Sequence, residues 1–470
     1  MDAFVIHGGQ RLRGRVRIHG SKNATLPLMA AALLSDEQVT LHDVPDLSDV
    51  RNLAKLLTQL GCRAQWQDPP EPGGGSTLIL QVTDPSPRTA EYDIVRTMRA
   101  TFNVLGPLLA KRGEATVSMP GGCNIGDRPI DLHLRGLRAM GARITLDGGY
   151  IHAKVPESGR LLGTRLFLGG PFGPTVTGTA NIMSAATLAE GTTIIESAAC
   201  EPEIENLGEL LNKMGAQIRG AGTPRITIEG VEALQKAEHT VIGDRIEAGT
   251  YIMAAAVTNG DVILENCPID ALTAVMDRLV EVGVEVEHLE ISPQVGVSTG
   301  AAVASVDSGP GTLLAVKSEP TSPQAMRQCI RVASSRRLNP ITVTTQPHPG
   351  FPTDLQAQIM ALLSIADGNS IITEKIFPDR FLHVAEMLRM GAHLIRNGSS
   401  VLISGVRSLI GAPVMASDLR ASAGLVLAGL GARGTTTINR VYHLDRGYER
   451  MERTLQSLGA DIERIDVPST

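Results

Sequence analysis

Apolar residues recur every three or four positions in six stretches of the chain, and each stretch ends at a glycine. This spacing places the apolar side chains on one face of a helix, so it predicts six amphipathic helices packed on a core. A glycine just after such a run is the usual left-handed residue that ends a helix. The stretches are residues 53–60, 134–140, 204–214, 272–282, 381–388 and 448–458, closed by Gly61, Gly141, Gly215, Gly283, Gly391 and Gly459. The same ending six times indicates an internal repeat.

A second kind of helix is predicted upstream of each amphipathic one. These stretches are apolar on nearly every side and rich in small residues, which is typical of helices buried on all faces. They cover residues 24–34, 101–110, 179–189, 250–258, 356–366 and 421–432. A β-rich run, such as 39–41 or 193–195, lies between the two helices of a unit. The repeating unit is therefore a buried helix, a strand, an amphipathic helix and a strand.

Six such units predict two domains of three units each, because 470 residues exceed one ordinary core. We expect a first domain at 22–243, which carries a loop at 119–129, and a second domain at 244–470 together with 1–21. The N-terminal strand at 3–18 precedes the first unit, and by pattern alone it could pair with either half. The fourth and fifth closing glycines are the furthest apart, which predicts an insertion near 292–337. The expected fold class is α/β, with buried helices inside and sheets outside.

The amino-acid composition argues against several classes of protein. The chain is 43% hydrophobic and 20% charged, as in a globular protein, and its net charge of −6 argues against a general nucleic-acid binder. The five cysteines are odd in number and scattered, so neither a disulfide framework nor a zinc site is indicated. No run of 18 apolar residues and no signal-like start occur, so we expect a cytoplasmic protein without a membrane partner.

A loop rich in glycine and proline surrounds one thiol between a strand-like run and a helix-like run. It reads Pro120-Gly121-Gly122-Cys123-Asn124-Ile125-Gly126-Asp127-Arg128-Pro129. A thiol in such a loop is poised for chemistry when nearby cations lower its pKa. The alternative interpretation is that Cys123 is a small apolar filler in a turn.

Unusual polar residues gather at the starts of the predicted buried helices. Helix N-termini attract anions, because their free N–H groups carry partial positive charge. Helix capping explains Thr353, Thr179 and Ser422, but a cation at a helix start opposes the dipole unless an anion binds too. The cations at these positions include Lys22, Arg99 and Arg420. The repeat therefore predicts an anion site between the two halves.

Several longer motifs resemble those of one known family. They are Gly20-Ser21-Lys22-Asn23-Ala24, Thr97-Met98-Arg99-Ala100, Gly121-Gly122-Cys123 through Arg128-Pro129, Pro347-His348-Pro349-Gly350-Phe351-Pro352-Thr353-Asp354, Asp379-Arg380-Phe381, Asp418-Leu419-Arg420-Ala421-Ser422 and Asp445-Arg446-Gly447-Tyr448-Glu449-Arg450. Together they resemble the enolpyruvyl transferases, and among these the branch that acts on UDP-N-acetylglucosamine. The similarity runs over nearly the whole chain except the insertion.

The resemblance implies a fold and a reaction. The fold is a two-domain inside-out barrel, in which each domain has three βαβαββ-like units with pseudo-threefold symmetry. The reaction moves the enolpyruvyl group of phosphoenolpyruvate onto the 3′-hydroxyl of UDP-N-acetylglucosamine and releases phosphate, as in the committed step of peptidoglycan synthesis. The implied route is addition and elimination through a tetrahedral ketal, which needs a general acid, a base and fixed cations but no cofactor and no metal.

The resemblance also assigns roles residue by residue. Cys123 matches the loop cysteine that acts as general acid, adds covalently to phosphoenolpyruvate and is alkylated by fosfomycin. Asp354 matches the aspartate at the sugar hydroxyl, either as base or only to position the hydroxyl. The implied phosphoenolpyruvate site is Lys22, Asn23, Arg128 and Arg420, of which Lys22, Arg128 and Arg420 are also placed in the catalytic set. The implied UDP-N-acetylglucosamine site is Arg99, Arg128, Pro129, Ile130, Asp131, Leu132, Thr175, Asp354 and Ile376.

Two cations carry over less clearly, and two positions depart from the family. Arg380 and Arg245 are equally explained by structural ion pairs. Cys200 stands where the family commonly has arginine, and Gly173 where it often has lysine, so affinity for the nucleotide sugar is expected to be lower if either cation steadies the diphosphate. Cys200 is expected to be a buried filler rather than a second nucleophile.

Two alternatives remain for the function. One is an enzyme like 5-enolpyruvylshikimate-3-phosphate synthase, which shares the fold and the donor but lacks a loop cysteine of this kind. The other is a non-catalytic paralogue that binds the nucleotide sugar. The intact set of Lys22, Cys123, Arg128, Asp354 and Arg420 argues against the second.

Overall fold

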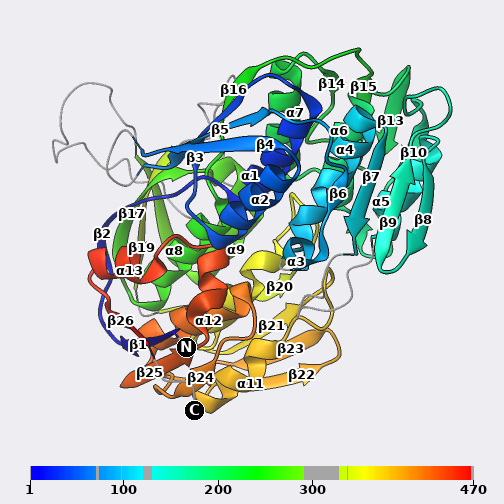
Figure 1. Cartoon of the computed structure of the whole chain (residues 1–470). Coiled ribbons are helices and arrows are strands. Elements are labelled where there is room, and N and C mark those ends of the chain that lie inside the picture. The colour runs from blue at the N-terminus through cyan, green and yellow to red at the C-terminus, as the bar shows by residue number, and fades with distance from the viewer. Residues whose placement is uncertain are drawn as a thin grey trace.

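The described part of the chain forms six four-stranded sheets that share one topology. The computed structural model describes residues 2–69, 74–96, 98–119, 130–289, 328–335 and 337–466 (Figure 1). In each sheet a short edge strand runs parallel to the second strand, and the second, third and fourth strands are antiparallel neighbours. The repeat of six units predicted from the apolar pattern is therefore present in the strand pairing as well.

Three of the sheets belong to the first half of the chain. Their strands, in spatial order, are β16 (Ala237–Thr240), β3 (Val39–Val44), β5 (Ser76–Val82) and β4 (Cys62–Gln67); β6 (Thr89–Ala90), β7 (Glu114–Ser118), β9 (Tyr150–Lys154) and β8 (Arg143–Asp147); and β10 (Arg165–Phe167), β13 (Thr192–Glu196), β15 (Arg225–Glu229) and β14 (Gln217–Arg219). A two-stranded ribbon, β11 (Gly169–Gly170) with β12 (Gly173–Pro174), follows β10. The edge strand β16 comes after the third unit yet pairs with β3 of the first, so it closes the ring of three units.

The other three sheets belong to the second half and include both N-terminal strands. They are β2 (Arg13–Arg17), β17 (Asp261–Cys267), β19 (Gln328–Ser334) and β18 (Val284–Leu289); β20 (Thr342–Thr344), β21 (Asn369–Thr373), β23 (Ser400–Ser404) and β22 (His393–Asn397); and β24 (Pro413–Met415), β25 (Thr435–Asn439), β1 (Asp2–His7) and β26 (Asp461–Asp466). The N-terminal segment, which the sequence left open to either half, thus pairs with the second. Strand β19 falls inside the segment 292–337 that the sequence assigned to an insertion, and the part of that segment up to 327 lies outside the described residues.

Six buried helices fill the interior of the two halves. They are α1 (Lys22–Ala31) continued by η1 (Ala32–Leu34), η2 (Arg99–Val104) continued by α4 (Leu105–Arg112), α6 (Val176–Ala186), α8 (Arg245–Val257), η5 (Thr353–Leu355) continued by α10 (Gln356–Leu363), and α12 (Leu419–Gly431). Every residue of α8 is buried, and α8, α10 and α12 pack against one another. Small residues allow this close approach: the Cβ of an alanine at Gly424 would lie 2.8 Å from the Ala357 carbonyl oxygen of α10.

The amphipathic helices occupy the predicted positions. They are α2 (Ser48–Gln59), α5 (Asp131–Ala139), α7 (Pro202–Lys213), α9 (Thr273–Val282) preceded by η3 (Ile269–Leu272), α11 (Leu382–Arg389) and α13 (Met451–Ser457). All six closing glycines have positive φ, from 79° at Gly61 to 100° at Gly215. Two short helices, α3 (Tyr92–Val95) and η6 (Val441–Arg446), complete the described elements. The predicted fold class, helices inside and sheets outside, is confirmed.

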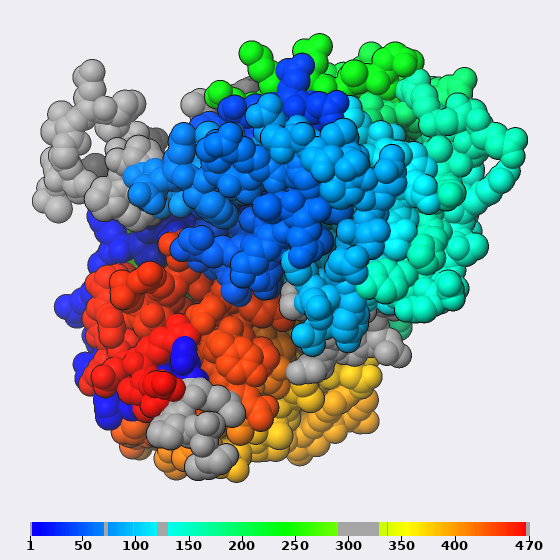
Figure 2. All heavy atoms as spheres, in the orientation of Figure 1, coloured from blue at the N-terminus to red at the C-terminus, as the bar shows by residue number. Residues whose placement is uncertain are grey.

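Two separate hydrophobic cores lie behind the two sets of sheets. One is built from buried residues between Ala24 and Val241, and the other from residues between Phe4 and Ile18 together with Ile246 to Ile462. In Figure 2 the first half (blue to green) lies against residues 337–466 of the second half (yellow to red), and Figure 1 shows β1 and β2 beside strands of the second half. We retain the division at 243/244 as a proposal. None of the described helices has the length and apolar content to cross a membrane.

The chain crosses between the halves twice, and the two crossings are hydrogen-bonded to each other. Gly20 and Gly243 form an antiparallel bridge, and the Asp244 N–H donates to the His19 carbonyl at 2.8 Å. His19 also binds Glu247 of α8: its N–H donates to Oε2 at 2.8 Å, and its Nδ1 lies 3.0 Å from Oε1. Burial alone would lower the pKa of His19, but Glu247 reverses the effect and raises it to about 9. The crossing is thus held by a buried ion pair.

This ion pair predicts a pH dependence of stability. Because the pKa of His19 is higher in the folded chain, its contribution is complete below pH 6.5 and is lost as the pH rises to about 9. Between these limits, the wild type is expected to lose up to about 3 kcal/mol of unfolding free energy relative to Glu247→Gln, measured by denaturant titration. Glu238→Gln is the matched control, because Glu238 is exposed and pairs with His42 at 3.8 Å. Parallel pH profiles for wild type and Glu247→Gln would contradict the assignment.

Candidate active site

The N-termini of three buried helices meet near the crossings and carry three of the predicted site residues. Lys22 is the first residue of α1, whose N-cap is Ser21, and its N–H donates to the Asp244 carboxylate at 3.1 Å. Asp354 lies in η5, which leads into α10, and Arg420 is in the first turn of α12. Asp244 and Asp418 accept N–H groups of the first turns of α8 and α12, so these helix starts are capped by carboxylates.

Asp354 is held by two guanidinium groups. Arg380 Nη1 donates to its Oδ1 at 2.8 Å, and Arg420 Nη2 donates to its Oδ2 at 3.1 Å. Burial alone would raise the pKa of Asp354, but Arg420 and Arg380 dominate and hold it well below its usual range. The Asp354 side chain remains 26% exposed while Arg420 is 3% exposed. The carboxylate is therefore ionised and open on one side, while its arginine partner is enclosed.

Arg420 is fixed by a second contact. Its Nη1 donates to the Tyr448 hydroxyl at 3.3 Å, and the guanidinium lies 5.7 Å from the centre of the Tyr448 ring. That hydroxyl also lies 2.8 Å from Thr250 Oγ1 and accepts from Gln358 Nε2 at 3.3 Å. Burial opposes the charge, but Asp354 raises the pKa of Arg420 above its usual value. Residues of α8, α10 and α12 thus share the placement of one cation.

Lys22 and Arg446 share a different carboxylate, Asp49 of α2. Lys22 Nζ lies 3.7 Å from Asp49 Oδ2, and Arg446 Nε donates to Asp49 Oδ1 at 2.9 Å. Burial lowers the pKa of Lys22, and the neighbouring charges Asp49 and Asp354 oppose this shift while Arg420 and Arg446 add to it. Lys22 thus lies close enough to Asp354 and Arg420 for their charges to act on it, and the shared role that the sequence assigned to the three residues stays a prediction.

Two carboxylates of this site are each shared by two cations. Asp49 pairs with Lys22 and Arg446, while Asp354 pairs with Arg380 and Arg420. A third carboxylate, Asp244, accepts the Lys22 N–H and acts on the charge of Arg420. Cations that are held in this way at helix N-termini are suited to bind an anion.

Three of the predicted nucleotide-sugar residues lie at the starts of helices in the first half. Thr175 is the N-cap of α6 and accepts the Gly178 N–H at 3.1 Å, Asp131 begins α5, and Arg99 begins η2. Buried His133 of α5 connects these elements. Its Nε2 lies 3.2 Å from Thr177 Oγ1, and its Nδ1 lies 3.1 Å from an Asn181 amide that also binds the Phe102 carbonyl.

Of the remaining predicted site residues, some lie within the described part of the chain and others do not. Ile130 is the N-cap of α5 and Leu132 follows Asp131, Asn23 lies in the first turn of α1, and the Ile376 N–H donates to Glu374 Oε1 at 2.8 Å. The roles assigned to all of them stay predictions. Cys123, Arg128 and Pro129 lie outside the described residues.

Arg245 forms a bidentate pair with Glu203, at 3.0 and 3.3 Å, between α8 and α7. Because this pair joins the two halves, the structural interpretation of Arg245 fits its observed contact. Arg380, for which the sequence left both interpretations open, pairs with Asp354 itself.

At Gly173 φ is +104°, and an added Cβ would lie 2.8 Å from Pro347 Cγ, so a lysine there requires Pro347 to move. Burial raises the pKa of the Cys200 thiol, which makes it a poor nucleophile.

Residues that sequence reasoning missed line the seam between the halves. Asp49 gave no signal, because it looks like an ordinary acidic residue in the first turn of an amphipathic helix. Arg446 and Tyr448 belong to a motif that carried the resemblance, but no role was assigned to them. Beside them the Ser48 hydroxyl donates to the Asp445 carbonyl at 3.2 Å.

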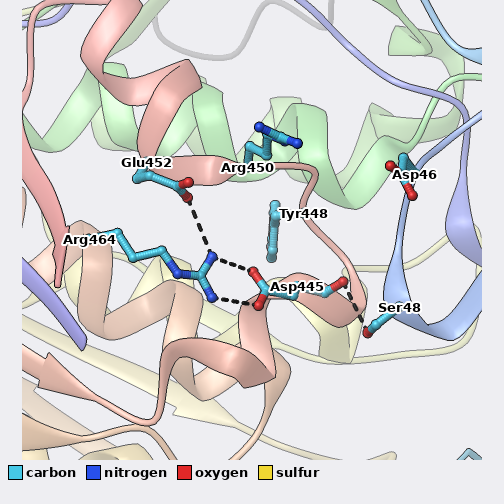
Figure 3. Close-up of a pocket in the computed structure, with 7 residues that line it drawn as sticks. All are labelled: Asp46, Ser48, Asp445, Tyr448, Arg450, Glu452 and Arg464. Atoms are coloured by element: carbon cyan, nitrogen blue, oxygen red, sulfur yellow. Dashed lines mark hydrogen bonds and ion pairs between the residues drawn. The ribbon is translucent and has the colours of Figure 1, made fainter. Parts of the chain in front are cut away.

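Figure 3 shows a pocket of about 330 Å³ at this seam, where Arg464 is bound by Asp445 and Glu452. It is lined by Asp46, Ser48, Asp445, Tyr448, Arg450, Glu452 and Arg464. It does not include Lys22, Asp354 or Arg420, so we assign the chemistry to the residues around Asp354 and not to this pocket.

Comparison with known proteins decides the family. Residues 6–455 match the family profile of EPSP synthase (3-phosphoshikimate 1-carboxyvinyltransferase). The chain belongs to the EPSP synthase family of enolpyruvyl transferases. It is 48% identical over 465 residues to UDP-N-acetylglucosamine 1-carboxyvinyltransferase of Anaeromyxobacter sp. (strain K), covering 99% of this chain and 100% of that protein. It is 46% identical to the protein of that name from Myxococcus xanthus, covering 99% of each.

Solved structures of enolpyruvyl transferases share the fold. The enolpyruvyl transferase NikO from Streptomyces tendae superposes with a TM-score of 0.81 at 22% identity, covering 99% of both chains. EPSP synthase from Acinetobacter baumannii superposes with a TM-score of 0.71 at 19% identity, covering 99% of this chain and 100% of that one. At these identities the likeness establishes the fold alone.

The shared carboxylate Asp49 predicts a shift in the pH profile of enolpyruvyl transfer. Asp49 raises the pKa of Lys22 against the effect of burial, so Asp49→Asn should lower that pKa further. Lys22 then loses its charge at a lower pH, and the basic limb of kcat/KM for phosphoenolpyruvate moves to lower pH. Asp46→Asn is the matched control, because Asp46 lies just before α2 and close to Asp49 in the chain but pairs with Arg51. An unmoved basic limb in Asp49→Asn would show that Lys22 does not set it.

Proposed function

We propose that the chain transfers the enolpyruvyl group of phosphoenolpyruvate to the 3′-hydroxyl of UDP-N-acetylglucosamine and releases phosphate. The observation that carries the proposal is the ionised, partly exposed carboxylate of Asp354, which Arg380 and Arg420 hold beside Lys22. The names of the relatives, which match over the full chain, support the same acceptor. The reaction belongs to the first committed step of peptidoglycan synthesis, and a cytoplasmic location is part of the proposal.

The cations provide the anion site. Phosphoenolpyruvate carries a phosphate and a carboxylate, and Lys22 and Arg420 lie at helix N-termini where anions are favoured. Arg446 shares Asp49 with Lys22 and adds a third cation nearby. Arg128 and Asn23, implied by the resemblance, complete the proposed pocket.

The chemistry proceeds by addition and elimination. A proton is added to the methylene carbon of phosphoenolpyruvate while the sugar hydroxyl oxygen bonds to the neighbouring carbon and releases its own proton to solvent, which gives a tetrahedral ketal. Loss of a proton from the new methyl group then re-forms the double bond as the carbon–oxygen bond to phosphate breaks. Fixed cations favour this path because they meet the negative charge of the leaving phosphate.

The lowered pKa of Asp354 bears on its role. A carboxylate whose pKa is lowered holds a proton weakly, so Asp354 is better suited to orient the sugar hydroxyl than to retain its proton. Its open oxygen side can accept the hydroxyl while the two arginines hold the group in place. We therefore assign Asp354 to positioning the hydroxyl.

The test of the proposed function is phosphate release from phosphoenolpyruvate. Release is expected with UDP-N-acetylglucosamine and not with shikimate 3-phosphate or without an acceptor. Release with shikimate 3-phosphate alone would assign the chain to the other branch of the family. Binding of the nucleotide sugar without any release would indicate a non-catalytic paralogue.

Cys123 is proposed as the general acid and as the site of inactivation by fosfomycin. Cys123→Ser is expected to lower kcat by about 10²- to 10⁴-fold, the range for loss of a general acid, and fosfomycin should inactivate the wild type. Cys123→Asp should keep some activity and escape the inhibitor, because a carboxylic acid can also donate a proton. Cys200→Ser is the control, because Cys200 is a half-buried thiol with no proposed role in catalysis, and this variant should stay sensitive to fosfomycin. Full activity of Cys123→Ser would exclude the role.

A further inference from the structure

Glu374 is a buried carboxylate with no assigned role, and it lies directly behind Asp354. It follows strand β21 and is 0% exposed. Its Oε1 accepts hydrogen bonds from Thr345 Oγ1 at 2.7 Å and from the N–H groups of Ile376 and Phe377 at 2.8 and 3.0 Å. Its Oε2 accepts from Thr353 Oγ1 at 2.9 Å. A carboxylate this enclosed and this fully hydrogen-bonded fixes the groups that donate to it.

The bond from Thr353 sets the direction of a second bond. A threonine hydroxyl has one proton to donate, and here the carboxylate receives it. The lone pairs of Thr353 Oγ1 are therefore free to accept, and Arg380 Nη1 donates to this oxygen at 3.0 Å. The same Nη1 donates to Asp354 Oδ1 at 2.8 Å. The chain of bonds thus runs from Asp354 through Arg380 and Thr353 to Glu374.

We propose that Glu374 is a positioning residue for the reaction, which orients Asp354 through Thr353 and Arg380. The proposal rests on the function proposed above, in which Asp354 receives the sugar hydroxyl. Glu374 also holds the backbone of Ile376, a predicted residue of the nucleotide-sugar site. One buried group therefore sets the geometry of two places that the acceptor is expected to touch.

The charge of Glu374 is what the arrangement requires. A glutamine at this position has the same shape, but its amide nitrogen donates. If the nitrogen faces Thr353, the hydroxyl must accept from it, and the hydroxyl proton loses the carboxylate oxygen that received it. If the nitrogen faces the other way, it meets the N–H groups of Ile376 and Phe377, which are also donors. Either orientation removes hydrogen bonds that the carboxylate accepts, so Glu374→Gln cannot preserve both arms.

Four variants separate a positioning role from a structural one. Glu374→Gln and Thr353→Val are each expected to lower kcat on the order of 10- to 100-fold, as for a misplaced reacting group, with little change in KM for phosphoenolpyruvate. Thr353→Ser keeps the hydroxyl and should restore most of the activity. Thr345→Val removes one bond to Oε1 and leaves the Thr353 arm intact, so its kcat should stay within about threefold of the wild type.

Two further readouts decide whether Glu374 acts through Thr353. The double variant Glu374→Gln/Thr353→Val should be no worse than the worse single variant, because both remove the same chain of bonds. The acid limb of kcat should move to higher pH in Thr353→Val, since a less aligned Arg380 lowers the pKa of Asp354 less.

Two outcomes would overturn the proposal. One is that the kcat losses of the two single variants multiply in the double variant. The other is that Glu374→Gln has a lower melting temperature but a normal kcat below that temperature. If Glu374→Gln does not fold, the contrast of Thr353→Val with Thr353→Ser decides, and equal activity of these two overturns the proposal. Wild-type phosphate release tests the proposed function separately, since the proposal about Glu374 concerns only the ratio of variant to wild type.

Discussion

The sharing of two carboxylates among four cations is the interaction on which the site depends. Asp49 and Asp354 keep Lys22, Arg446, Arg380 and Arg420 together. The buried helix starts hold Lys22 and Arg420 in place, where the partial positive charge of the helix N-terminus also favours an anion.

The repeat explains how the cations reach one place. Each buried helix is packed against its neighbours by small residues, so its direction is fixed by the core and not by the loop before it. The crossings at Gly20 and Gly243 then set one half against the other through backbone bonds and the His19–Glu247 pair. Residues at helix starts in both halves consequently face the same seam. In the proposal for Glu374, this buried carboxylate orients Asp354 through Thr353 and Arg380 and does not contact Asp354 itself.

Much of the site could be predicted because its residues stand at equivalent positions of a repeat and in long motifs. Lys22, Asp354 and Arg420 were predicted in this way; in the structure Asp354 pairs with Arg420, and both charges act on Lys22. Asp49 was missed because nothing in its local pattern differs from a helix-start carboxylate, and its partner Arg446 is 397 positions away. Glu374 was missed because nothing in the sequence distinguishes a carboxylate after a strand. Its partners Thr345, Thr353 and Ile376 are known only from the folded chain.

The sequence by itself determined the local elements: the two kinds of helix, the closing glycines with positive φ and the count of six units. These depend on the spacing of apolar residues and on backbone freedom within a few positions. Only the tertiary structure decided that β1 and β2 join the second half and that β16 closes the first. The tertiary structure also decided which carboxylate pairs with which cation. Strand partners and ion pairs join residues hundreds of positions apart, and no local pattern records which of the available edges or charges will meet.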